Sequence, residues 1–210
     1  MNLIIKITFC ISGLFFISSI FADQAEYSYI PPSHIYYESE KNDDASSKNF
    51  SRILSPDKKW VAYLKKSHHI IPTICADLAN TGSNYGNEIW IYNLQTKTKR
   101  LLVADNFSCN HPYKEIIDPK NLQFSPDSKT LYFITSARPT SGAIHSVDVD
   151  GKNLRFVTDG NEYHVVNSGH YKGDLIVNQH RYRLHPMGSY DWDWLFTPQG
   201  KQIKLYKKEN

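Results

Sequence analysis

A turn of the same sequence occurs twice in this chain, and this internal repeat constrains the fold more than any other feature. Residues 54–63 read Leu-Ser-Pro-Asp-Lys-Lys-Trp-Val-Ala-Tyr, and residues 124–133 read Phe-Ser-Pro-Asp-Ser-Lys-Thr-Leu-Tyr-Phe. Proline presets φ for a turn, and the aspartate that follows accepts hydrogen bonds from the next backbone amides. Each copy connects the end of one apolar strand to the start of another. The repeat therefore predicts successive units of antiparallel strands.

Short strand signals continue along the rest of the chain. They are alternating runs rich in β-branched and aromatic residues, bounded by Gly, Pro, Asn or Asp, at residues 59–64, 88–94, 130–135, 174–178 and 192–196. Such spacing is typical of an all-β sandwich, barrel or propeller. Two further strands follow each Ser-Pro-Asp turn, and a third unit has the same order without the motif. We therefore expect three four-stranded antiparallel units, at about residues 50–105, 120–160 and 162–207.

The repeat resembles the TolB-like β-propeller repeat. Blades of that family carry a Phe-Ser-Pro-Asp-Gly-Lys turn, an aromatic-rich strand and an Ile-Tyr-hydrophobic-Asp strand before Asp-Gly. The match is closest over residues 121–159, fair over residues 50–105 and weak over residues 162–206. Lys58 and Ser128 stand where the repeat favours glycine.

This resemblance implies a β-propeller-like domain over residues 50–210. A propeller ring has typically 4–8 blades. The chain has three, or four if residues 27–50 supply another. We therefore expect an incomplete or small ring: an open arc, a compact four-blade ring, or a ring completed by a partner such as a second copy of the chain.

The N-terminus has the pattern of a secretory signal peptide over residues 1–22. Lys6 is its only charge, residues 7–21 are uncharged and largely apolar, and Ala22 stands at a plausible cleavage point. A retained membrane anchor is the alternative. Cleavage would leave residues 23–49 as a polar, extended lead-in and the protein in the periplasm or outside the cell, with no attachment to the membrane.

Export changes how the cysteines are interpreted. Cys10 would leave with the signal peptide, so Cys75 and Cys109 remain as the only pair. An even number of cysteines in an oxidising compartment favours a disulfide. The alternative is two small buried apolar side chains.

The connections predict which end of the sheets is functional. Turns within the predicted hairpins are short on one side, whereas residues 67–87, 104–119 and 180–191 form long connections on the other. Loops of this length in a compact domain are usually functional or disordered. A disulfide between Cys75 and Cys109 would join two of these long loops, and we expect binding at this long-loop face.

One of these connections is rich in the residue types that dominate protein interfaces, which are Arg, Tyr and Trp. The candidate partner-binding residues are His180, Arg181, Tyr182, Arg183, His185, Tyr190, Asp191 and Trp192. For Trp192, filling the space between sheets is the alternative. His68 and His69 are neighbours, and adjacent strand residues point to opposite faces, so we predict no metal site there.

Charge and motifs limit the function. The chain has 24 Lys and Arg against 21 Asp and Glu, a net charge of +3 that does not indicate a nucleic-acid binder. We find no nucleophile elbow, zinc-protease motif or phosphate loop, and we predict no catalytic residue and no cofactor. We expect an exported, non-catalytic module that binds a protein partner; a periplasmic immunity protein against a delivered toxin is one specific form. The alternative is an enzyme, or its accessory domain, that processes envelope glycans or peptides with His and Asp residues of the same face.

Overall fold

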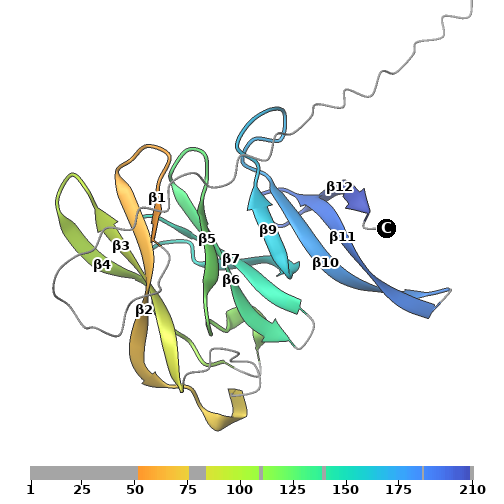
Figure 1. The fold of residues 1–210 in the computed structure, drawn as a ribbon, viewed down its shortest axis with the longest axis horizontal. Helices are drawn as coiled ribbons and strands as arrows, with labels where there is room; N and C mark the ends of the chain where they lie inside the picture. Colours follow the sequence, from red (N-terminus) through yellow and green to blue (C-terminus); the bar gives the residue numbers. More distant parts are fainter. Residues whose placement is uncertain (1–51, 76–83, 109–110, 139–140, 186, 209–210) are drawn as a thin grey trace, which may run out of the picture. The chain divides into compact units, whose positions relative to one another are not determined.

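A computed structural model describes residues 52–75, 84–108, 111–138, 141–185 and 187–208. These residues form three four-stranded antiparallel sheets that follow one another along the chain, as Figure 1 shows. Helical structure among them is limited to two short 3-10 turns, η1 (Thr73–Cys75) and η2 (Pro112–Lys114). The expected all-β class with four-stranded units is confirmed. Residues 1–51, which include the predicted signal peptide and the segment for a fourth blade, lie outside the described part.

Each sheet is built from strands that are consecutive in the sequence. The first sheet has the order β1-β2-β3-β4, the second β5-β6-β7-β8, and the third β12-β11-β10-β9. The strands of the first are β1 (Arg52–Leu54), β2 (Trp60–Ile70), β3 (Tyr85–Asn93) and β4 (Thr98–Val103). Those of the second are β5 (Lys120–Phe124), β6 (Thr130–Arg138), β7 (Ser141–Asp148) and β8 (Arg155–Gly160). Those of the third are β9 (Glu162–Val165), β10 (Leu175–Leu184), β11 (Met187–Phe196) and β12 (Gln202–Lys208).

The Ser-Pro-Asp turns have the hydrogen bonds that their sequence predicts. Ser55 Oγ donates to Asp57 Oδ1 at 2.6 Å, and the backbone N–H of Lys59 donates to the same oxygen at 3.1 Å. The second copy repeats the first of these bonds between Ser125 and Asp127, also at 2.6 Å. These bonds close the turn between β1 and β2 in the first sheet and the turn between β5 and β6 in the second, and they hold the paired strands in register.

The two departures from the family repeat lie where the turn needs a left-handed residue. Lys58 has a φ of 59° and Ser128 a φ of 62°. This region favours glycine because a Cβ atom crowds the following carbonyl. Ser128 has a compensating role, because its Oγ accepts a hydrogen bond from the backbone N–H of Asp57 at 3.0 Å. The bond links the turns of the first and second sheets.

Alternation along β6 explains how the sheets pack. Successive side chains of a strand point to opposite faces. Leu131 and Phe133 are buried in a cluster with residues of the first sheet, whereas Tyr132 and Ile134 are buried in a cluster with residues of the third. The second sheet is therefore covered on both faces, which is the face-to-face packing of propeller blades.

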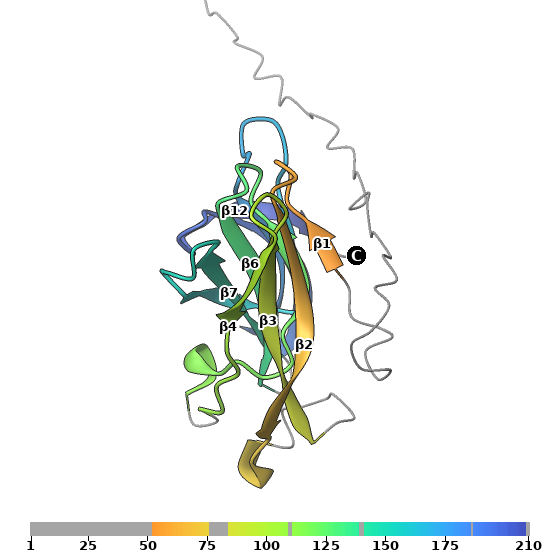
Figure 2. The same cartoon turned by 90° about the vertical axis from the view of Figure 1, so that its left-hand side faces the viewer.

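The Ser-Pro-Asp turns and the segments predicted as long loops lie at opposite ends of the strands, but the predicted difference in length is not general, because the β9–β10 connection at the Ser-Pro-Asp end is longer than the β6–β7 connection at the other end. In Figure 1 the Ser-Pro-Asp turns lie at the upper ends of the first two sheets, and the β2–β3, β6–β7 and β10–β11 connections lie at the lower ends. Figure 2 shows β2 and β3 running together toward that lower end, where η1 follows β2. We call this end the long-loop end.

The lengths of the predicted loops need correction. Strand β2 continues to Ile70 and β3 starts at Tyr85, so the connection between them is shorter than residues 67–87. The described parts of the second predicted loop, residues 104–108 and 111–119, contain η2 and an isolated bridge between Asn106 and Ile116. The third predicted loop, residues 180–191, is almost entirely strand. The alternation in these segments was concealed because charged and polar residues occupy both faces.

The environment of Cys75 bears on the predicted disulfide. Cys75 is fully buried and packs with Ile71, Ile117 and Phe107. Its Sγ lies 4.0 Å from the carbonyl oxygen of Phe107, two residues before position 109. Cys109 itself is outside the described residues, so its bond to Cys75 stays a prediction. Over the described ranges, the chain also contains no helix that is long and apolar enough to cross a membrane.

Candidate binding site

The predicted binding segment forms a two-stranded arm at the long-loop end. Strands β10 and β11 pair continuously up to Leu184 opposite Met187. Only the first part of β10, up to Asn178, pairs with β9, and only the part of β11 from Trp192 onward pairs with β12. Within the described residues, Gln179–Leu184 and Met187–Asp191 therefore pair with each other and with no other strand, and we call this segment the hairpin arm.

The register divides the candidate residues between the two faces of the hairpin arm. Because facing residues of a strand pair share a face, His180, Tyr182, Ser189 and Asp191 lie on one face together with the Leu184–Met187 pair. Arg181, Arg183, Tyr190 and Trp192 lie on the other. The sequence-predicted set is thus brought onto one arm, but it does not form one continuous surface.

On the face that carries Arg181 and Arg183, the side chains form cation–π and ring–ring contacts with one another. The guanidinium of Arg181 lies 4.0 Å from the ring centroid of Trp194, and that of Arg183 lies 5.5 Å from the ring of Tyr190. The rings of Tyr190 and Trp192 are 4.2 Å apart. Such contacts contribute about 0.5–2 kcal/mol each. These contacts therefore stabilise the hairpin arm. An isolated two-stranded hairpin is only marginally stable in water, so such additional contacts are needed.

Arg181 makes more contacts with the rest of the third sheet than a solvent-exposed loop residue would. It donates to Gln179 Oε1 at 2.9 Å through Nε and to Gln202 Oε1 at 2.6 Å through Nη2. Trp194, on which it stacks, packs against the core cluster between the second and third sheets. Truncating Arg181 would therefore lower stability as well as any binding, so the residue is a poor probe of binding alone.

The opposite face is exposed and apolar at its tip. Tyr182 is 70% exposed, Leu184 78% and Met187 88%. Nearer the sheet, His180 Nδ1 lies 2.9 Å from Asp191 Oδ1, which orients the imidazole ring. Leu184 and Met187 were not among the predicted residues. The sequence signal that could have identified them is their position on either side of the His185-Pro186 dipeptide. Large apolar side chains next to such a sequence are candidates for exposure at the end of a hairpin.

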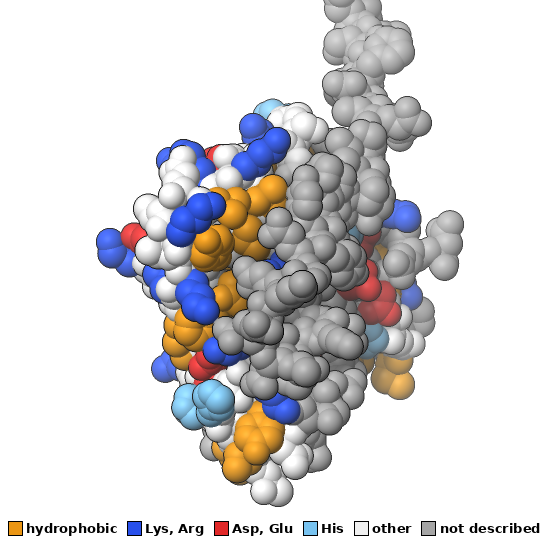
Figure 3. All heavy atoms as spheres, turned by 60° about the vertical axis from the view of Figure 1, so that its left-hand side comes forward, with side chains coloured by type: hydrophobic (Ala, Val, Ile, Leu, Met, Phe, Trp, Pro, Cys, Tyr) orange, Lys and Arg blue, Asp and Glu red, His pale blue; other side chains and the backbone are white. Residues whose placement is uncertain are grey.

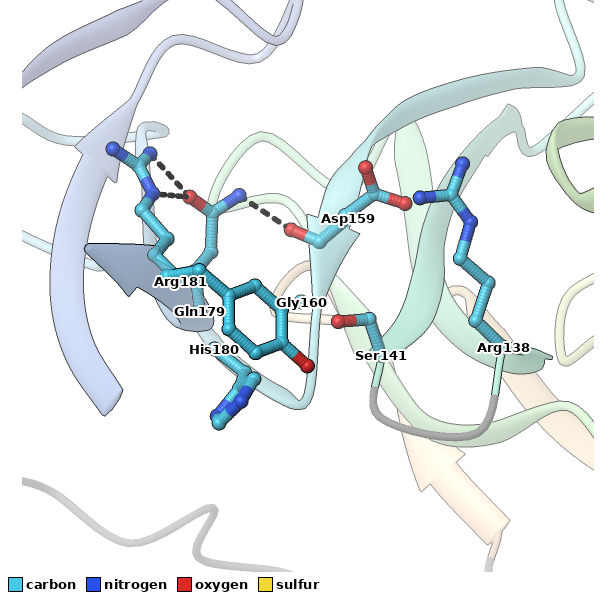
Figure 4. Close-up of a pocket in the computed structure, with 8 residues that line it drawn as sticks. Arg138, Ser141, Asp159, Gly160, Gln179, His180 and Arg181 are labelled. Atoms are coloured by element: carbon cyan, nitrogen blue, oxygen red, sulfur yellow. Dashed lines mark hydrogen bonds between the residues drawn. The ribbon is translucent and has the colours of Figure 1, made fainter. Parts of the chain in front are cut away.

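A polar pocket of about 400 Å³ lies at the base of the hairpin arm. In Figure 4, Gln179 reaches the backbone of Asp159 on one side, and Arg138 points toward the carboxylate of Asp159 on the other. Gln179 Nε2 donates to the Asp159 carbonyl oxygen at 2.6 Å. Burial raises the pKa of Asp159, and the charge of Arg138 acts in the opposite direction. The pocket offers positive, negative and amide groups, which is a suitable lining for a polar segment of a partner.

The first sheet also carries polar side chains at the long-loop end. The side chain of Asp105, which lies just after β4, is only 1% exposed. Ser67 Oγ donates to its Oδ2, and His69 Nδ1 lies 2.7 Å from its Oδ1. This hydrogen bond and the charge of Asp105 raise the pKa of His69. His68 is exposed and does not take part in the cluster.

No protein-family model matches this chain, and no curated protein does either. Solved structures do resemble it. Dipeptidyl peptidase 4 of Porphyromonas gingivalis superposes with a TM-score of 0.50 and 10% identity over 76% of this chain and 24% of that chain. TolB from Acinetobacter baumannii gives a TM-score of 0.44 and 16% identity, over 73% and 31% of the two chains. The β-propeller domain of the Trilobed protease from Pyrococcus furiosus gives 0.44 and 17%, over 72% and 40%.

At these identities the likeness concerns the fold alone. The chain spans well under half the length of the three solved structures named above. The sheet topology, together with the likeness to the dipeptidyl peptidase 4 structure, confirms the expected fold class: an all-β, propeller-like arrangement of three four-stranded antiparallel blades.

Proposed function

We propose that this protein is an exported, non-catalytic module that binds a protein partner through the hairpin arm. The observation that carries the proposal is the exposed apolar tip formed by Tyr182, Leu184 and Met187 on strands that pair only with each other. An apolar group of this kind at the end of a projecting element is typical of an interaction site. Tyr and Arg side chains beside it are enriched at interface hot spots.

The surroundings of the tip support a protein as the ligand. The pocket at the base of the arm supplies charged and amide groups, whereas the tip supplies Leu and Met side chains that have no hydrogen-bonding atoms to offer a sugar. An apolar centre with a polar rim is the usual anatomy of a protein–protein interface. Within this proposal, a periplasmic immunity protein that neutralises a delivered toxin is one specific form.

We infer export from the predicted signal peptide, and cleavage of this peptide is testable. We expect protein isolated from the exporting cell to begin within about three residues of Asp23 and to contain no free thiol. The Cys75–Cys109 bond would contribute about 4 kcal/mol by loop closure, so reduction should lower the melting temperature by about 10 °C. Intact-mass measurement with and without alkylation tests both points. Retention of Met1, or two cysteines that alkylate without reduction, would contradict the proposal of export.

The decisive experiment compares partner binding by four forms of the protein, which are the wild type, two single variants and the double variant. We expect Leu184→Ser and Met187→Ser each to weaken partner binding about 30-fold, which corresponds to about 2 kcal/mol, the size of a hot spot. Both side chains are exposed, so the melting temperature should change by less than about 2 °C. A double variant used as bait in an envelope extract should lose the specific partner that the wild type retains.

The matched control removes two positive charges at the opposite end of the strands from the hairpin tip. Lys97 and Lys152 lie in or beside the short turns, and Lys97→Ala with Lys152→Ala should leave both capture and affinity unchanged. Equal affinities of the wild type and the double hairpin variant for the captured partner would refute a binding role of the tip.

The alternative function has one specific observation in its favour. His180 is paired with Asp191 beside a pocket that holds Asp159 and Arg138, an arrangement that can orient an imidazole for proton transfer. An envelope glycan- or peptide-processing activity would then disappear with His180→Ala alone. A binding function should instead lose affinity in steps as several side chains of the hairpin arm are removed.

A further inference from the structure

Three metal-ligating side chains gather at the long-loop end of the first sheet. They are His69 on β2, Glu88 on β3, and Asp105, which lies just after β4. Each offers one ligand atom, and these atoms all lie within 4.8 Å of one another. We call this group the His69 cluster. In Figure 3, which brings the first sheet forward, exposed histidine side chains lie near the lower edge of the molecule.

An irregularity in the pairing of β2 with β3 lies beside the cluster. The register shifts between Lys66 and Ile70, so residues 67–69 of β2 stand opposite the single residue Gly86 of β3. Ser67 and His69 both reach Asp105, and the backbone N–H of His69 donates to Ser67 Oγ at 3.1 Å. Irregularities of this kind are common beside functional sites.

The two carboxylates are held in place before any ion binds. The Asp105 side chain is 1% exposed, and Ser67 donates to it. Glu88 Oε2 accepts a hydrogen bond from Trp90 Nε1 at 3.0 Å. Gly86 leaves the space for Asp105, because a Cβ atom at that position would lie 3.0 Å or less from Asp105 and Phe107 atoms. His69 is 66% exposed, which gives an ion a path from solvent.

The charge of the cluster favours a cation. Two carboxylates face one imidazole. Lys65 stands opposite Glu88 in the strand register, but its Nζ lies 4.9 Å from the ring centroid of Trp90. Over the described residues, neither Asp105 nor Glu88 forms an ion pair with a lysine or an arginine.

We propose that the His69 cluster binds a divalent transition-metal ion of the Zn²⁺ type. One imidazole nitrogen and two carboxylate oxygens suit Zn²⁺, whereas Mg²⁺ and Ca²⁺ prefer oxygen ligands only. Zinc lies about 2.0–2.2 Å from such atoms, so binding requires His69 to exchange its hydrogen bond with Asp105 for the ion and the three donors to move closer together. Ser67 would orient Asp105 from outside the coordination sphere. Three protein ligands leave a position open for water or for a partner side chain.

The test uses tag-free protein that has been stripped with a chelator. Titration with Zn²⁺ in a calorimeter should show one site with a Kd of about 10 μM or lower. At a hundredfold excess over Kd, Zn²⁺ should raise the melting temperature by about 5 °C or more. Mg²⁺ at the same concentration should do neither. No binding of Zn²⁺ up to about 1 mM, or equal binding of Mg²⁺, would overturn the proposal.

Neighbouring histidines provide a matched comparison. His69→Ala and Glu88→Gln should each weaken Zn²⁺ binding at least tenfold, and both residues are accessible enough for the variants to fold. His68→Ala removes the adjacent, exposed imidazole and should leave the Kd unchanged. If His68→Ala weakens binding as much as His69→Ala, or if Glu88→Gln binds like the wild type, the ion is held elsewhere and the assignment is wrong.

Discussion

Replacing Gly200 by alanine is expected to destabilise the protein by about 2–5 kcal/mol, although the change adds only one methyl group. Gly200 lies in the turn between β11 and β12 and has a φ of 86°. Any other L-residue in this region costs about 1–2 kcal/mol. A Cβ atom would also overlap the carbonyl oxygen of Val157 on β8. Because the obstacle is backbone, relief requires the second and third sheets to move apart, which adds about 1–3 kcal/mol.

Gly173 is the matched control for this prediction. It has a φ of 93°, but a Cβ atom there would meet nothing within 4 Å. Gly173→Ala should therefore cost only the conformational part, about 1–2 kcal/mol. Thermal or urea unfolding of the two variants measures the difference. Equal losses of stability would mean that the turn at Gly200 does not pack on β8 as the structure has it.

Glu115→Gln is expected to remove a pH-dependent loss of stability that reaches about 3 kcal/mol. Glu115 follows η2 and is fully buried, and within the described part of the chain neither carboxylate oxygen has a hydrogen-bond partner. Burial raises its pKa from 4.5 to about 7. Between those values the unfolded chain releases the proton more readily than the folded one, so stability falls as the pH rises from about 4.5 to about 7. A shift of this size corresponds to about 3 kcal/mol.

Glutamine removes the titration, so the free energy of unfolding of the variant relative to the wild type should rise by about 3 kcal/mol from pH 4.5 to pH 8. His145 also makes stability depend on pH in this range, because burial lowers its pKa from 6.5 to about 4. The stability that it contributes is lost as the pH falls from about 6.5 to about 4, but this loss is the same in both proteins. Melting temperatures across the range measure the difference, which corresponds to roughly 6–12 °C.

Glu162→Gln is the control for Glu115. Glu162 is an exposed glutamate on β9, so the same change of charge should shift stability by less than about 0.5 kcal/mol at every pH. A difference between Glu115→Gln and the wild type that does not vary with pH would show that the Glu115 carboxyl is solvated.

The sequence by itself determined the local structure of this protein. The Ser-Pro-Asp turns, the strand segments and the order of four strands in each sheet follow from interactions between residues close in sequence. Even the left-handed positions of the turns were marked, since Lys58 and Ser128 are the residues that depart from the glycine of the family repeat. Alternation predicted that β6 would be a strand, although not that both of its faces would be buried.

The contacts between side chains at the long-loop end depend on the tertiary structure and could not be predicted from the sequence. Periodicity placed His68 and His69 on opposite faces but could not foresee that His69 would lie within hydrogen-bond distance of Asp105, which is 36 residues later in the chain. It also treated residues 180–191 as a loop, because charged and aromatic side chains on both faces of the hairpin arm hide the alternation of a strand. Short-range patterns encode turns and strands, because the atoms that stabilise them are a few residues apart. The His69 cluster and the β10–β11 arm depend on register and packing between distant segments, and a single sequence carries no direct record of those contacts.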